Sequence, residues 1–169
     1  VFVALVLGAI IGGMAVEYWM TRNAPAPAAQ QQAPTGAAAA VVTFLKSILP
    51  TQSHSMIDAG YHWTNLWFAA EKKNWTLARY LIGEARQSMR WTVLLRPVRQ
   101  LPDGKTVDVK GIFTAVDMSA FAAVQLAVED EDQAAFVTAY KSALEGCYTC
   151  HVSSGLAYLR PVVPTTPAS

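Results

Sequence analysis

The stretch EDQAAFVTAYKSALEGCYTCH, residues 131–151, decides how this chain folds. Within it, side chains three and four residues apart form one stripe, at Val137, Tyr140, Leu144, Cys147 and His151. A spacing of three and four residues is typical of an amphipathic helix whose stripe packs against neighbouring helices. We therefore predict a helix that begins near Glu131 and carries both cysteines of the chain and a histidine close to its C-terminal end.

Two more helices are predicted in the first half of the bundle. Ser53 or Ser55 could cap the first, which we expect to run to about Lys73. Asn74 is a suitable N-cap for the second, residues 75–95, which the dipeptide Arg96-Pro97 should end. Because almost no chain connects these helices, they are expected to pack as antiparallel neighbours.

Another helix is expected from about Asp117 to Val128. Before it, residues 101–113 contain the turn signal Pro102-Asp103-Gly104 and are interpreted as a long loop, too short for a sheet. The fold class predicted from these patterns is all-α, an antiparallel four-helix bundle over residues 53–155 followed by an irregular tail, residues 156–169.

The beginning of the chain has a different composition. Residues 1–16 carry no charge, and with the next few residues they reach the ~20 residues that span a bilayer. We predict a retained transmembrane anchor over residues 1–22. A cleaved signal peptide is the alternative, but the apolar run is long, lacks a clear cleavage site and ends in Tyr18-Trp19. A flexible Pro/Ala/Gln linker, residues 23–36, and a short helix or connector, residues 37–52, follow.

Cys147-Tyr148-Thr149-Cys150-His151 is the attachment signature of c-type haem. Two thiols one helical turn apart can bond to one edge of a porphyrin, and the adjacent His151 then reaches the iron as proximal ligand. A zinc site would require His54 and His62 to converge on the two cysteines, and a thioredoxin-like pair would require a βαβ context. The motif therefore predicts one covalently bound haem c, with Cys147, Cys150 and His151 as its site.

The second axial ligand of the iron is open at this point. Met56 and His62 are the candidates on the first helix, and they lie about 120° apart around its axis, so only one can point at the iron. We favour Met56, because it lies nearer the start of that helix. Lys141 and Arg160 are interpreted mainly as surface charges, although either could reach a haem propionate. Aromatic residues at helical spacing are interpreted mainly as core: Trp63, Trp67, Phe68, Trp75 and Tyr80.

The chain resembles the cytochrome c′ and c556 group of four-helix-bundle haem proteins. The resemblance rests on the haem motif at the end of the last helix and on two stretches, His62-Trp-Thr-Asn-Leu-Trp-Phe-Ala69 and Asn74-Trp-Thr-Leu-Ala-Arg-Tyr-Leu81. It implies that His151 is the proximal ligand and, by analogy with c556-like members, that Met56 is the distal one. The predicted anchor, linker and Pro-rich tail depart from that group and suggest a fixed subunit.

The expected function is single-electron transfer by a membrane-tethered cytochrome, not catalysis. Haem is attached to such proteins outside the cytoplasm, which predicts a single-pass protein of the bacterial inner membrane with its haem domain in the periplasm. Its partner would be a membrane redox complex: a quinol-oxidising complex, an oxidase or a photosynthetic reaction centre. The net charge of +1 predicts no nucleic-acid binding. A gas-binding or gas-sensing haem protein and an assembly subunit of a membrane complex are the alternatives.

Overall fold

A computed structural model describes residues 35–169, so the predicted anchor and almost all of the linker lie outside the described residues. The chain divides into two units, Val1–Ser47 and Ile48–Ser169, which we treat separately. The described part of the first unit is essentially one helix, α2 (Gly36–Ile48), none of whose residues is buried. The helix begins one residue before the segment predicted over residues 37–52 and ends four residues before the end of that segment.

The second unit begins with two long helices joined by a short turn. Helix α3 (Gln52–Glu71) starts earlier than predicted, because the Thr51 hydroxyl, and not Ser53 or Ser55, accepts the capping hydrogen bond from the His54 amide (3.3 Å). It also ends before Lys73, which adopts a left-handed φ of 55°. Helix α4 (Trp75–Leu95) is capped by the Asn74 side chain and stops at Arg96, and both predictions are confirmed.

The predicted loop over residues 101–113 is wrong in part. Strands β1 (Val98–Gln100) and β2 (Thr106–Asp108) pair antiparallel, with Arg99 opposite Val107. The turn signal at residues 102–104 closes this hairpin, since Gly104 adopts a φ of +83° and its amide donates to the Leu101 carbonyl (3.0 Å). Residues 106–108, which follow the turn, thus form a strand instead of a loop.

The next helix begins at Val109, and our expectation of a start at Asp117 is wrong. Three consecutive segments form it: α5 (Val109–Val116), a π-helical turn η1 (Asp117–Phe121) and α6 (Ala122–Glu129). Its cap is Asp108, whose carboxylate accepts a hydrogen bond from the Gly111 amide (2.9 Å). Within residues 35–169 this helix alone is long and apolar enough to cross a membrane, judged by length and composition.

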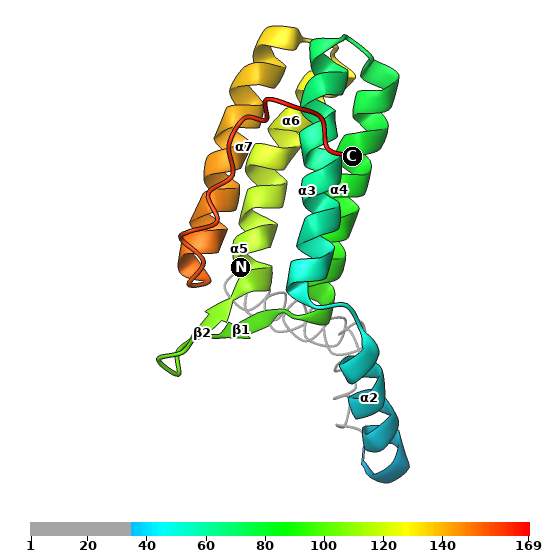
Figure 1. Ribbon diagram of the computed structural model, residues 1–169, viewed down its shortest axis with the longest axis vertical. Helices are drawn as coiled ribbons and strands as arrows, with labels where there is room; N and C mark the ends of the chain where they lie inside the picture. The colour runs from blue at the N-terminus through cyan, green and yellow to red at the C-terminus, as the bar shows by residue number, and fades with distance from the viewer. Residues whose placement is uncertain (1–34) are drawn as a thin grey trace, which may run out of the picture. The chain divides into compact units, whose positions relative to one another are not determined.

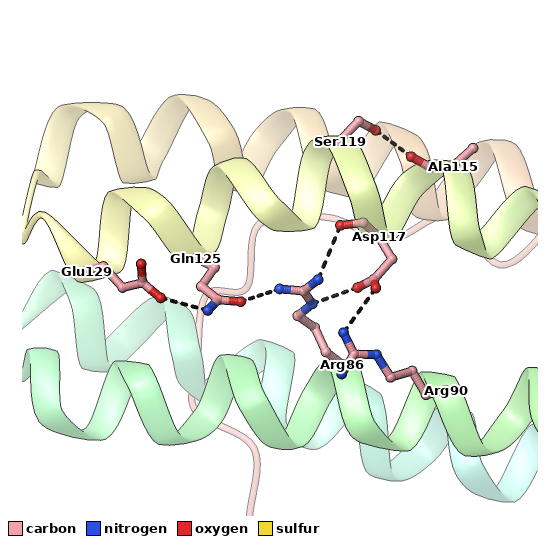
Figure 2. Close-up of polar contacts among 7 residues, drawn as sticks. All are labelled: Arg86, Arg90, Ala115, Asp117, Ser119, Gln125 and Glu129. Atoms are coloured by element: carbon pink, nitrogen blue, oxygen red, sulfur yellow. Dashed lines mark hydrogen bonds and ion pairs between the residues drawn. The ribbon is translucent and has the colours of Figure 1, made fainter.

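The π turn positions a carboxylate against two arginines of α4 (Figure 2). Asp117 is buried and pairs with Arg86 at 2.6 Å and with Arg90 at 3.1 Å. Arg86 also donates to the Gln125 side chain, which in turn donates to Glu129 (2.6 Å). One extra residue in a helical turn changes the direction in which side chains point, so the π turn lets an ionic clamp hold α4 against this helix.

The last helix, α7 (Gln133–Ser153), begins two residues later than expected. Asp132 caps it by accepting hydrogen bonds from the amides of Ala134 and Ala135, both at 2.9 Å. On the predicted stripe Tyr140 and Leu144 are buried, and Val137 and Cys147 are partly buried against the same core. Residues 156–169 contain no helix or strand.

The second unit is mostly helical, which agrees with the all-α class. Helix α3 packs against α4, α4 against α5 and α6, these against α7, and α7 against α3 (Figure 1). Aromatic rings fill the space between α3 and α7, where Trp63 stacks on Tyr140 (centroids 5.1 Å apart) and Trp67 lies near Phe136 (6.0 Å). Trp75 is also core, as predicted, whereas Tyr80 is 58% exposed and is not.

Candidate functional site

The cysteine motif lies at the C-terminal end of α7, at the same end of the unit as the start of α3 and the β-hairpin (Figure 1). Cys147 and Cys150 are both free thiols of intermediate exposure. Cys147 packs against the hydrophobic core, whereas Cys150 lies near the hydroxyl of the buried Ser154. The helix thus presents two thiols one turn apart, one of them turned inward.

Burial keeps both thiols in their neutral form. Desolvation, with a smaller contribution from the charge of Cys150, raises the pKa of Cys147 to about 12. Desolvation also raises the pKa of Cys150, and the hydrogen bond with Ser154 partly opposes this rise. Thiols in this state are poor nucleophiles and poor ligands for a free metal ion, since both roles require the thiolate.

The chain reverses direction immediately after the motif. The Leu156 amide donates to the His151 carbonyl (2.8 Å) and the Gly155 amide to the Val152 carbonyl (3.0 Å). This pair of bonds is the Schellman motif, and it requires a left-handed residue, which is Gly155 with a φ of +74°. The reversal returns the tail past the end of α7, and the Leu159 amide closes a further turn on the Leu156 carbonyl (2.8 Å).

The returning tail orients His151. The imidazole Nδ1 lies 2.5 Å from the Leu159 carbonyl oxygen. A carbonyl oxygen can only accept, so Nδ1 carries the proton, and in the neutral imidazole Nε2 is then the nitrogen with the free lone pair. A hydrogen bond from the second ring nitrogen to a backbone carbonyl is how proteins fix the tautomer of metal-binding histidines.

The ring contacts between α3 and α7 fix the register of these helices. Trp63 lies against Tyr140, and Trp67, one turn further along α3, lies against Phe136, one turn back along α7. The helices are therefore antiparallel. Extending this register by two turns toward the end with the motif places Met56 at the same level as Cys147. Both side chains are partly buried against the same hydrophobic core.

His62 points elsewhere. Its Nε2 lies 3.8 Å from the Asp58 carboxylate, and its ring meets the ring of Tyr80 on α4 edge-on, with the centroids 6.3 Å apart. Its Nδ1 is buried and has no hydrogen-bond partner in the described part of the chain. Of the two distal candidates, the structure therefore brings only Met56 to the level of the cysteines on the core side of α3.

Residues 35–169 contain no group of three or more His, Cys, Asp or Glu side chains arranged to hold a metal ion. The zinc interpretation needed His54 and His62 to join the two cysteines. His62 instead faces α4, and His54 lies in the first turn of α3.

The two basic candidates for a propionate contact, Lys141 and Arg160, line one groove of about 510 Å³ between α7 and the tail. Leu144 and Val163 form part of its apolar wall. Arg160 is not a free cation, because its guanidinium pairs with Glu145 (2.9 Å) and lies 4.3 Å from the ring centre of Tyr148. Gly155 and Leu159 were not among the residues predicted for the site. A glycine shortly after a helix was the available signal for Gly155.

Protein-family models, characterised proteins and solved structures were all compared with this chain, and none of them matches it.

Proposed function

We propose that this protein is a c-type cytochrome that carries one haem on Cys147 and Cys150, with His151 as the proximal iron ligand. The observation that carries the proposal is the hydrogen bond of the His151 Nδ1 to the Leu159 carbonyl, because it holds the orientation of the ring and, in the neutral imidazole, leaves the lone pair on Nε2. A histidine prepared in this way, beside two cysteines at the attachment spacing, fits haem better than zinc or a dithiol redox pair.

The donor set agrees with this group. The two thiols are free and lie one helical turn apart, so their spacing fits two covalent bonds to one edge of the porphyrin. When bound, the haem would supply an iron centre that changes oxidation state by one electron. The chain itself would hold that centre by its cysteines, orient one axial ligand through the tail and exclude water with its core.

We assign the distal position to Met56. Met56 lies at the level of Cys147 and against the hydrophobic core, and both observations support this assignment. The contacts of His62 with Asp58 and Tyr80 direct its ring toward α4. A thioether on the iron raises the reduction potential and leaves no open site, which suits an electron carrier.

The four helical segments around one core also support an antiparallel bundle of the cytochrome c′ type over residues 53–155. With the apolar residues 1–22 as a membrane anchor, the haem domain would lie in the periplasm of a bacterium, tethered to the inner membrane. A tether raises the effective concentration of the domain near a membrane partner. We propose as partner a quinol-oxidising complex, a terminal oxidase or a photosynthetic reaction centre.

Absorption spectra of the protein, produced in a host that attaches haem c, test this function. We expect a six-coordinate, low-spin spectrum in the reduced state that carbon monoxide does not change. A five-coordinate spectrum that shifts with carbon monoxide would favour the gas-binding alternative. Unchanged turnover of the partner complex after loss of the haem would favour an assembly subunit.

A further inference from the structure

Helix α2 separates its apolar and polar side chains onto two arcs. At 100° per residue, Phe44, Ile48, Val41 and Leu45 share one arc, and Thr43, Lys46 and Ser47 share the opposite one. The apolar arc is exposed, with 62% of the Phe44 surface and 61% of the Ile48 surface accessible. Four large apolar side chains on one exposed arc require a partner that is itself apolar.

The length of α2 and the charge of its surroundings indicate a lipid surface. The helix has 13 residues, about 20 Å at ~1.5 Å per residue, which is too short to cross a ~30 Å hydrocarbon core. Between Glu17 and Asp58 the sequence contains no acidic residue, whereas Arg22 and Lys46 are basic. An amphipathic helix in a stretch of sequence without negative charge suits the interface of an anionic bilayer.

The length of chain between the proposed anchor and α2 also agrees with a position of α2 at the bilayer. The proposed anchor ends near Arg22, and residues 23–35 connect it to α2. Even fully extended as a polyproline-type spacer, at ~3.1 Å per residue, this connection reaches only about 40 Å from the membrane. The helix therefore remains within reach of the bilayer that holds the anchor, at high effective concentration.

We propose that α2 lies flat in the headgroup region of an anionic bilayer, with the arc of Val41, Phe44, Leu45 and Ile48 turned toward the acyl chains. This inference rests on the proposed membrane anchor. Its consequence is a shorter tether: the unit Ile48–Ser169 is then attached to the membrane surface through the residues around Pro50, not through the whole stretch from residue 23. A short tether confines the electron-carrying domain to partners in the same membrane.

Hydrogen exchange measured by mass spectrometry on the full haem-loaded chain, one copy per nanodisc of phosphatidylcholine and phosphatidylglycerol, tests the proposal. Two variants add the same charge on opposite arcs: Leu45→Glu on the apolar arc and Thr43→Glu on the polar arc. We expect the α2 amides to exchange roughly tenfold faster in Leu45→Glu than in the parent, the effect of losing one buried leucine side chain, and to stay protected in Thr43→Glu. Leucine and glutamate have similar helix propensities, so lost propensity would not explain the difference.

Equal exchange in the two variants would overturn the proposal. Protection that appears only with two copies per disc would also overturn it, because a second chain would then cover the arc. The anchor is judged separately, by recovery of the protein with the discs at high salt. A chain that leaves the discs would refute the anchor. A chain that is retained, but whose α2 amides exchange equally in the two variants, would refute only the binding of α2 to the bilayer.

Discussion

The substitution Gly155→Ala probes the link between the end of α7 and His151, the proposed proximal ligand. Gly155 has a φ of +74°, and an alanine in the left-handed region costs about 1–2 kcal/mol. A reduced entropy of the unfolded chain returns about 0.4–1 kcal/mol of this. The new Cβ would lie 3.4 Å from a methyl group of Leu101, which can move. We therefore expect a net loss of about 1 kcal/mol in the free energy of unfolding.

The same substitution should change the iron. The Schellman turn at Gly155 directs the tail that carries the Leu159 carbonyl, so distorting it weakens the hydrogen bond from His151. A histidine that loses this bond is a less basic ligand and stabilises the oxidised iron less, so the reduction potential should rise. If the preference for oxidised iron falls tenfold, the rise is about 59 mV.

Gly104→Ala is the matched control. Gly104 has a similar φ of +83° in the hairpin turn and no atom within 4 Å of an added Cβ. Both variants should lose similar stability in equilibrium unfolding by denaturant, but only Gly155→Ala should shift the midpoint potential. Equal potentials in both variants and the parent, despite the expected destabilisation, would refute the role of the Leu159 carbonyl.

Four further substitutions test the distal ligand, the ion pairs of Asp117 and the packing of the core. Met56→Ala should open the iron to carbon monoxide, whereas His62→Ala should leave the spectrum unchanged; the reverse result would assign His62 as the distal ligand. Asp117→Asn should lower the free energy of unfolding by about 2 kcal/mol, because it leaves partly buried arginines without a carboxylate. Burial opposes ionisation of Asp117, but hydrogen bonds and charges from the two arginines hold its pKa below its usual value. The difference in the free energy of unfolding between parent and variant should therefore be full above pH ~4 and shrink as the pH falls below it. Tyr140→Phe removes a buried 3.0 Å hydrogen bond to the Trp63 carbonyl and should cost about 1 kcal/mol, measured by urea unfolding; an unchanged free energy of unfolding would contradict a stabilising contribution from this bond.

The sequence predicted the helices best where capping and periodicity agreed. Asn74 was identified correctly as a cap, and the stripe through Tyr140 and Leu144 was identified correctly as the buried face of the last helix. The prediction failed at the start of the third helix, which we expected near Asp117. Asp108 caps this helix, and Asp117 is buried in a π turn by contacts with α4 that no local pattern encodes.

Only the cysteine motif of the candidate site could be predicted from local sequence. The spacing of Cys147, Cys150 and His151 is a property of one helix and could be read directly. The choice between Met56 and His62 depends on the register between α3 and α7, which only the ring contacts revealed. The contribution of Leu159 depends on a backbone carbonyl placed by a chain reversal, and backbone groups leave no signature in the identity of a side chain.

The most direct test of the central claim is the mass of the purified chain, together with its alkaline pyridine haemochrome spectrum, after production in a host that attaches haem c. We expect a mass increase of one haem that survives denaturation and acid extraction. We also expect the attachment to be lost when Cys147 and Cys150 are both replaced by serine. A chain with its bare polypeptide mass, or haem that is retained in the double variant, would contradict the assignment of Cys147 to His151 as a haem site.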